Sequence, residues 1–301
     1  MEIVGNTLDE VYVQAISNVM DNGVEVDPRG LLVKEIQGLH IKVNEPWKHV
    51  ITNTGRNMDL RFAVGEFLWY LDKDNSLDRL LFYNKRYKNF SDDGSTLHGA
   101  YGPRIFRKSW AAAKRKLCSD IHSRQAVINI YDANIDLEKA TKDVPCTLSM
   151  HFMIRNDKLQ LFVNMRSNDL IWGFPYDTFS FTMFQELMAK EIGIKMGSYH
   201  HYINSAHIYK RHYEISQKIR KNLSESYGLN LELKYIDKSI NAEYNLRKNR
   251  RYLNPSEKYL FPFFSEILNS ELSDRTKDNK MFRNSVDSLP SRLSPLISWR
   301  N

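Results

Sequence analysis

The sequence predicts an α+β fold, and three observations support that class. Apolar residues recur at helical spacing near the N-terminus, two short alternating segments flank Asn156-Asp157, and a long apolar stretch at residues 176–192 precedes a further strand-like segment. Helical and strand patterns therefore mix along the chain without the regular alternation that predicts a parallel α/β sheet.

The N-terminal part contains four elements with clear patterns. Residues 8–20 carry apolar side chains at helical spacing and predict a helix, and after two turn signals residues 31–43 predict a strand. Residues 62–71 are apolar enough for a buried helix, with Glu66 in its middle. Residues 110–118, rich in Ala and Lys, predict a further helix.

The following part of the chain is richer in strands. Residues 126–131 predict one strand, and residues 147–155 and 158–165 predict a hairpin-like pair around Asn156-Asp157. Residues 176–192 then predict a buried helix. A strand over residues 199–208 completes this part of the chain.

Composition sets broad limits on location and partners. The chain has 301 residues, 42% of them hydrophobic and 26% charged, as is ordinary for a globular protein. Its net charge of +7 favours anionic partners such as nucleotides or nucleic acid. Its two cysteines argue against a disulfide framework. With neither a secretory signal nor a bilayer-spanning apolar run, we expect a cytoplasmic protein with no membrane partner.

The side chains best suited to chemistry lie between residues 144 and 177. Here Pro145-Cys146 is followed by Arg166 and by two carboxylates. A thiolate can attack an electron-poor carbon, an arginine can hold a phosphate, and a carboxyl group can read the edge of a base. Arg166 and Arg124 can supply the positive potential that lowers the pKa of a thiol such as Cys146. The plainer alternative for Cys146 is a cysteine that only packs.

In order and spacing, these motifs resemble the thymidylate synthase superfamily over roughly residues 20–215. Besides Pro145-Cys146, the matching segments are Glu66-Phe67-Leu68-Trp69-Tyr70-Leu71, Ala100-Tyr101-Gly102, Ser123-Arg124, Arg166-Ser167-Asn168-Asp169, Gly173-Phe174-Pro175-Tyr176-Asp177 and His207-Ile208-Tyr209. The resemblance implies a mixed sheet packed by helices and a homodimer formed through the sheet face. Residues 1–217 would be the catalytic domain, and residues 218–301, polar and interrupted by prolines, a basic and mostly helical extension of that domain.

The resemblance also implies a role for each matching residue. Cys146 would add to carbon 6 of a pyrimidine nucleotide, so that carbon 5 attacks the one-carbon unit of methylenetetrahydrofolate. Glu66 would assist proton transfer, while Tyr101 and Asp169 would position the base, the folate and the proton-removal step. The residues expected to hold the nucleotide are Arg166, Ser167 and Arg29 at the phosphate, joined by Arg124 of the partner subunit, and His207 and Tyr209 at the sugar hydroxyl. No metal is implied.

Three of these residues have plainer interpretations. Glu66 in an apolar helix can be a paired structural carboxylate, although burying it without a partner is costly. His207 can be an ordinary strand histidine, and Arg29 can be a surface arginine.

Asp177 is the departure that bears on the base. Thymidylate synthases carry asparagine at this position, and an amide matches uracil. A carboxyl group accepts from the amino group of cytosine and, when protonated, donates to its ring nitrogen. The phage deoxycytidylate hydroxymethylases show the same change to aspartate, so we expect Asp177 to read cytosine. The alternative is that Asp177 caps the helix that follows it.

Other departures bear on the partner contact and on the final step. Thr147 and Gln125 replace a family histidine and the second arginine of the partner's phosphate clamp. The C-terminal Leu296-Ile297-Ser298-Trp299-Arg300-Asn301 does not resemble the short apolar tail that synthases fold over the folate. Such a tail excludes water, so its absence favours capture of the methylene intermediate by water rather than reduction by hydride.

The expected protein is therefore a (d)CMP 5-hydroxymethylase, a one-carbon transferase that uses methylenetetrahydrofolate. Its nearest rivals are a thymidylate synthase and a dUMP hydroxymethylase. A rival from another class is a non-catalytic nucleic-acid-binding or regulatory homologue, suggested by the net charge of +7 and the basic C-terminal region. The intact nucleophile, glutamate and phosphate contacts argue against that rival, and we do not expect a nucleic-acid partner.

Overall fold

The computed structural model of the chain describes residues 1–299, which packing divides into two compact units. Unit 1 contains residues 1–58, 108–135 and 145–228, and unit 2 contains residues 59–107, 136–144 and those from 229 onward. Arg300 and Asn301, the end of the tail considered above, lie outside the described residues. The predicted roles of residues 1–217 and 218–301 follow chain order and remain predictions, whereas packing joins segments that are distant in the chain.

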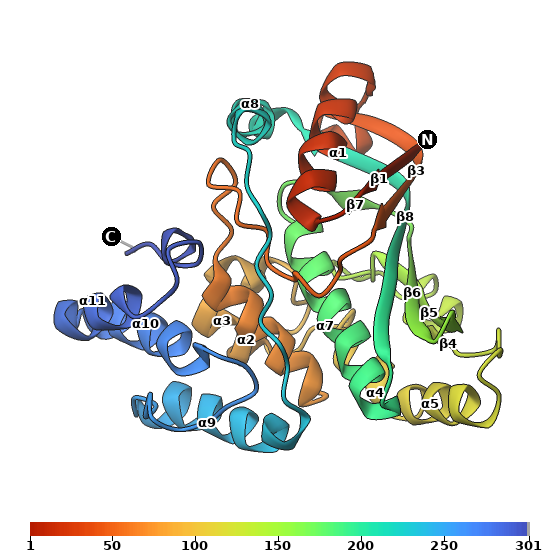
Figure 1. The fold of residues 1–301 in the computed structure, drawn as a ribbon. Coiled ribbons are helices and arrows are strands. Elements are labelled where there is room, and N and C mark those ends of the chain that lie inside the picture. Colours follow the sequence, from red (N-terminus) through yellow and green to blue (C-terminus); the bar gives the residue numbers. More distant parts are fainter. Residues whose placement is uncertain (300–301) are drawn as a thin grey trace. The chain divides into compact units, whose positions relative to one another are not determined.

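Unit 1 is built on an eight-stranded mixed sheet (Figure 1). Its main path has the order β1-β3-β8-β6-β5-β4, with β2 paired to β3 and β7 paired to β8. Pairing is parallel for β1–β3, β6–β8 and β7–β8 and antiparallel elsewhere. The strands are β1 (Glu2–Gly5), β2 (Val24–Val26), β3 (Val33–Val43), β4 (Val127–Asn129), β5 (Thr147–Arg155), β6 (Lys158–Met165), β7 (Asn168–Asp169) and β8 (Lys195–Tyr209).

Helices cover one face of this sheet, and the long α7 runs along β8 (Figure 1). The helices of unit 1 are α1 (Leu8–Asn22), α5 (Ser109–Ser119), α7 (Phe174–Ile192) and α8 (Tyr213–Lys221). Alternate residues of β8 point to opposite faces. Tyr199 and His201 are therefore buried on the helix side, where His201 meets Phe174 of α7, whereas His200 and Tyr202 lie on the other, half-exposed face.

Most of the predicted elements are confirmed with small changes at their ends. The two strands of the predicted hairpin are found with the predicted bounds as β5 and β6. The strand expected over residues 126–131 is shorter, because only Val127–Asn129 pairs with β5. The helix expected from residue 176 starts at Phe174, since Pro175 is well suited to a first helical turn.

Unit 2 is helical. It contains α2 (Leu60–Leu71), α3 (Leu77–Tyr83), α4 (Tyr101–Phe106), α9 (Ile236–Asn249), α10 (Phe264–Thr276) and α11 (Asn279–Asp287), and the one-turn α6 (Ala133–Asp136) ends in it. Buried ion pairs join its early and late helices: Arg61 of α2 with Glu271 of α10 at 3.4 Å, and Arg79 of α3 with Glu243 of α9 at 2.9 Å. Helices α9 and α10 are therefore anchored to α3 and α2 by charged groups that lie in the interior of the unit.

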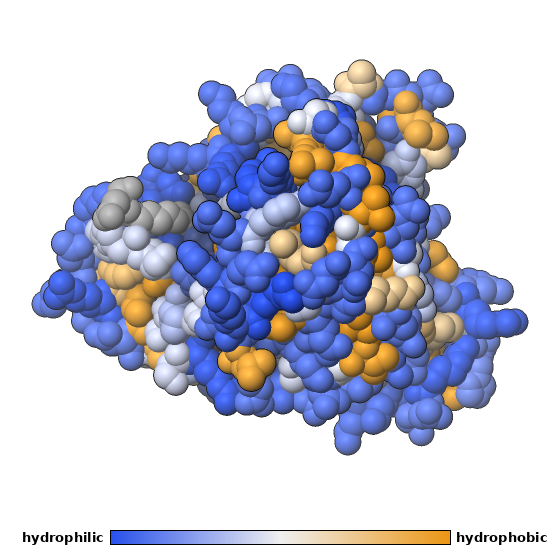
Figure 2. Space-filling view, turned by 90° about the horizontal axis from the view of Figure 1, so that it is seen from above, coloured by the Kyte–Doolittle hydropathy of each residue, from blue (hydrophilic) through white to orange (hydrophobic). Residues whose placement is uncertain are grey.

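None of the helices in residues 1–299 is long and apolar enough to cross a bilayer. On the face seen in Figure 2, hydrophilic side chains predominate and apolar ones form separate patches among them.

Candidate active site

The β5–β6 hairpin places Cys146 beside Arg166. Thr147 pairs with Met165, so the residues just outside the strands, Cys146 and Arg166, lie opposite each other. The Arg166 N–H donates to the Cys146 carbonyl at 2.9 Å, and its Nε donates to the Pro145 carbonyl at 2.9 Å. Its Nη2 lies 3.6 Å from the Cys146 Sγ. A guanidinium at this distance is the type of neighbour that favours a thiolate.

The short strand β7 places Ser167 and Asp169 beside His207. Asp169 pairs with His207 in parallel register, and the Ser167 Oγ lies 3.5 Å from the His207 Nδ1. His207 is only 9% exposed and meets the Tyr209 ring edge-on at 5.2 Å. Asp169 Oδ1 accepts a hydrogen bond of 2.8 Å from the main chain of Ile171. The pairing of β7 with the end of β8 thus brings four predicted site residues together: Ser167, Asp169, His207 and Tyr209.

Asp177 lies in the first turn of α7 but does not cap the helix. Gly173 occupies the N-cap position without a side-chain cap, so the capping interpretation is wrong. Asp177 instead accepts a hydrogen bond of 2.8 Å at Oδ2 from the Asn168 side-chain amide. Burial, together with the nearby charge of Asp169, raises the pKa of Asp177 to about 7. Near neutral pH this carboxyl group is therefore present in both protonation states.

Glu66 and Tyr101 belong to unit 2. Glu66 is only 5% exposed within α2, and the hydroxyl of Tyr87 donates to its Oε1 at 2.6 Å. The Tyr101 ring stacks on Tyr70 with centroids 5.6 Å apart. Gly102 allows this approach, because a Cβ there would lie 2.6 Å from the Tyr70 carbonyl oxygen. Glu66 is thus a buried, hydrogen-bonded carboxylate rather than a solvated one.

Arg29 and Arg124 are exposed in unit 1. Arg29 lies at the tip of the β2–β3 connection, where its side chain has no hydrogen bond or ion pair with any described residue. Arg124 precedes β4, and its main chain accepts a hydrogen bond from His151 of β5. His151 is five residues beyond Cys146 along an extended strand, a separation of roughly 17 Å. Arg124 therefore does not join Cys146 in its own chain.

The prediction from sequence missed several partners of these residues. Tyr87 binds Glu66, Asn168 binds Asp177, and His201 binds Asn168. Of these partners, only Asn168 could have been identified from the sequence, because it lies inside the Arg166-Ser167-Asn168-Asp169 motif. The segments around Tyr87 and His201 are polar and aromatic and match no motif.

Arg56 is a further cation missed from the sequence. It is only 6% exposed and donates from Nε to the Ile171 carbonyl at 2.5 Å. Its guanidinium lies over the rings of Trp172 and Tyr176 at 5.2 and 5.5 Å. Its Nη2 is buried without a hydrogen-bond partner among the described residues. A buried donor of this kind is available to an anionic or carbonyl-bearing ligand.

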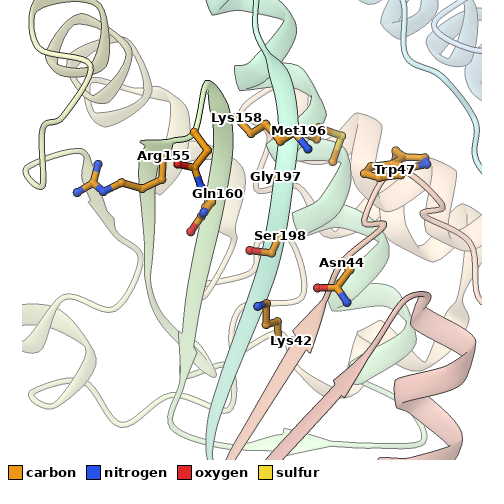
Figure 3. Close-up of a pocket in the computed structure, with 10 residues that line it drawn as sticks. Lys42, Asn44, Trp47, Arg155, Lys158, Gln160, Met196, Gly197 and Ser198 are labelled. Carbon is orange, nitrogen blue, oxygen red and sulfur yellow. The ribbon is translucent and has the colours of Figure 1, made fainter.

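A pocket in unit 1 lies away from these residues. Its volume is about 320 Å³, and its lining includes Lys42, Gln160 and Ser198 on the half-exposed side of the sheet (Figure 3). None of the predicted catalytic or substrate-binding residues lines it. Among residues 1–299 no group of three or more His, Cys, Asp or Glu side chains is arranged to hold a metal ion.

Comparison with known proteins identifies the family. A family profile described as thymidylate synthase matches residues 10–247. The chain belongs to the thymidylate synthase family. It is 32% identical over 278 residues to the deoxyuridylate hydroxymethyltransferase of Bacillus phage SP01, covering 83% of this chain and 72% of that protein.

Further relatives carry the same name. The deoxyuridylate hydroxymethyltransferases of Delftia phage PhiW-14 and Pseudomonas phage M6 are 31% and 32% identical, over 58% and 55% of this chain and 53% and 49% of their own lengths. Among solved structures, thermostable thymidylate synthase A from Bacillus subtilis gives a TM-score of 0.64 at 20% identity, covering 75% of this chain and 88% of that chain.

These findings confirm the predicted superfamily and its α+β fold. As a thymidylate synthase family member the protein is a one-carbon transferase, and the family acts on pyrimidine nucleotides with methylenetetrahydrofolate as co-substrate. The individual roles assigned to its site residues remain predictions.

Proposed function

We propose that the protein is a (d)CMP 5-hydroxymethylase. The observation that carries the choice of base is the half-buried carboxyl group of Asp177, which can be protonated near neutral pH. A neutral carboxyl group offers one donor and one acceptor, the complement of the ring nitrogen and amino group of cytosine. The three relatives named as hydroxymethyltransferases support the hydroxymethyl product.

In the proposed reaction, the Cys146 sulfur forms a bond to carbon 6 of the base, and carbon 5 becomes the nucleophile. Methylenetetrahydrofolate supplies the one-carbon unit that carbon 5 takes up. Loss of the carbon 5 proton releases tetrahydrofolate and leaves an exocyclic methylene. Water adds to that methylene as Cys146 leaves carbon 6, so no oxidation or reduction occurs. Glu66, with its Tyr87 partner, assists the proton transfers.

The folate is proposed to bind beside Arg56. The unpartnered Nη2 of this arginine, buried beside Trp172 and Tyr176, combines a cation with aromatic surfaces. This combination suits a ligand that carries both rings and carboxylates. Asp169 and Tyr101 are the residues proposed to position it.

The nucleotide is proposed to bind through its phosphate and sugar. Arg166 and Ser167, which follow β6, would hold the phosphate with Arg29 and with Arg124 of the partner subunit. His207 and Tyr209 would contact the sugar hydroxyl. The 3′ hydroxyl is common to both sugars, so the proposal covers CMP and dCMP.

The partner subunit is proposed to pack on the half-exposed face of the sheet. Rings line this face in a continuous stack: His40 on Tyr202 at 4.1 Å and Phe162 on His200 at 4.3 Å. Such aromatic surface is enriched in interfaces. A homodimer formed through this face is consistent with the exposed position of Arg124. The protein is proposed to act in the cytoplasm.

A second candidate is a dUMP hydroxymethylase, favoured by the names of the three relatives, which are all deoxyuridylate hydroxymethyltransferases. A reductive thymidylate synthase is a third. Mass spectrometry of products formed from dCMP, CMP and dUMP with methylenetetrahydrofolate separates all three. We expect a 5-hydroxymethylcytosine nucleotide and tetrahydrofolate. Formation of dihydrofolate would contradict the hydroxymethylase, and preferred turnover of dUMP would contradict the choice of cytosine.

A further inference from the structure

Asp177 is the last member of a chain of four hydrogen-bonded side chains. The Tyr199 hydroxyl lies 2.5 Å from the His201 Nδ1, and the His201 Nε2 lies 3.2 Å from the Asn168 Oδ1. The Asn168 Nδ2 then donates to the Asp177 Oδ2 at 2.8 Å. Tyr199 and His201 are fully buried on the helix side of β8.

The buried Tyr199 end determines which group donates in each of these hydrogen bonds. Burial lowers the pKa of His201 to about 3, so its ring is neutral and has one donor and one acceptor. Within the described residues the Tyr199 hydroxyl makes its only hydrogen bond to Nδ1, so its buried O–H donates there. His201 must then donate from Nε2 to the Asn168 oxygen. This leaves the Asn168 N–H directed at Asp177.

Gly173 provides the space for the last contact. A Cβ at this position would lie 2.7 Å from the Asn168 Nδ2 and 3.1 Å from the Asp177 Oδ2. Any larger residue would therefore press on both atoms of the hydrogen bond. The close contact with Asn168 and Asp177 thus explains why a glycine stands at position 173, independently of its backbone angles.

We propose that Asn168, His201 and Tyr199 are positioning residues that determine which oxygen of Asp177 carries a proton, and thereby which pyrimidine base the site accepts. The inference rests on the proposed role of Asp177 in reading the base. Because Oδ2 always accepts from Asn168, only Oδ1 can act as the donor. Cytosine and uracil present donors and acceptors in opposite order, so a carboxyl group with a fixed proton matches one base and opposes the other.

The test compares dissociation constants for dCMP and dUMP by isothermal titration calorimetry, which requires no turnover. Asn168→Leu removes the donor, and Tyr199→Phe removes the group that orients the chain. We expect the ratio of the two constants to move toward one, by about tenfold in Asn168→Leu and severalfold in Tyr199→Phe. Tyr12→Phe is the matched control, since Tyr12 is also fully buried in unit 1 and its hydroxyl has no partner among the described residues.

An unchanged ratio in folded Tyr199→Phe and Asn168→Leu would overturn the inference, as would an equal change in Tyr12→Phe. If Asn168→Leu does not fold, Tyr199→Phe alone decides, because it removes a single atom. Failure of the proposed function has a different signature. A wild-type protein that prefers dUMP would contradict the cytosine assignment, while the ratio would still move toward one in both variants.

Discussion

Among single residues, Cys146 has the most specific environment. Its carbonyl, its sulfur and the preceding Pro145 carbonyl all face Arg166 across the end of one hairpin. The second cysteine, Cys118, is exposed on α5 in a lysine-rich helix. The two thiols therefore provide an internal comparison.

We expect Cys146→Ser to reduce hydroxymethyl product formation by at least about a thousandfold, because a hydroxyl is a far weaker nucleophile than a thiolate. Cys118→Ser should retain wild-type activity. Product formation is followed by mass spectrometry at saturating substrates. Substantial turnover by Cys146→Ser would exclude covalent addition by this residue.

The ionisation of Asp177 predicts a pH dependence. Its pKa of about 7 in the free protein means that the neutral, hydrogen-donating form prevails below this pH and the carboxylate above it. Only the neutral form donates to the ring nitrogen of cytosine. We therefore expect kcat/KM for dCMP to fall above pH 7, approaching tenfold per pH unit. Asp177→Asn should be less active with dCMP and should lack this limb, and a limb that persists in Asp177→Asn would assign it to another group.

Among the elements, the β5–β6 hairpin was predictable because all of its determinants are local. Its strands alternate, and Asn156 and Asp157 both adopt positive φ, at 51° and 57°, as the tight turn between twisted strands requires. The order of the motifs also pointed to Cys146, Arg166 and Asp177 without any structural knowledge.

The C-terminal helices and the buried partners were less accessible from sequence. Glu243 and Glu271 are fully buried because Arg79 and Arg61 come from α3 and α2, far away in the chain. A charged residue that is buried through a distant partner weakens the apolar periodicity of its helix, so the segment after residue 218 reads as polar. The contact between His201 and Asn168 likewise joins residues that are distant in the chain.

The packing of α2 against α3 supports a prediction about Gly65, which precedes Glu66 in α2. A Cβ at Gly65 would lie 2.4 Å from the Tyr83 ring. Gly65→Ala should lower the free energy of unfolding by about 1–3 kcal/mol, since overpacking forces side chains or backbone to shift. Urea denaturation measures this change. In a Tyr83→Leu background the same substitution should cost less, and equal costs in both backgrounds would locate the strain elsewhere.

At the scale of the whole molecule, the proposed dimer explains why one expected phosphate contact is remote. His151, whose ring donates to the Arg124 main chain, lies roughly 17 Å along β5 from Cys146, and Arg124 is exposed before β4. An arginine so placed can serve catalysis only in the site of another subunit. In a twofold dimer each subunit would then lend Arg124 and receive the equivalent residue.

Intersubunit complementation tests this arrangement. Arg124→Ala and Cys146→Ser should each have low activity, by loss of a phosphate contact and of the nucleophile. In a heterodimer of the two, isolated through different affinity tags, one site combines the intact Cys146 of one subunit with the intact Arg124 of the other. We expect such heterodimers to recover about half of the wild-type activity per dimer, because one of two sites is restored. Arg166→Ala paired with Cys146→Ser is the control and should not recover, since both residues serve the same subunit's site. Equal lack of recovery in both pairs would place Arg124 outside the partner's site.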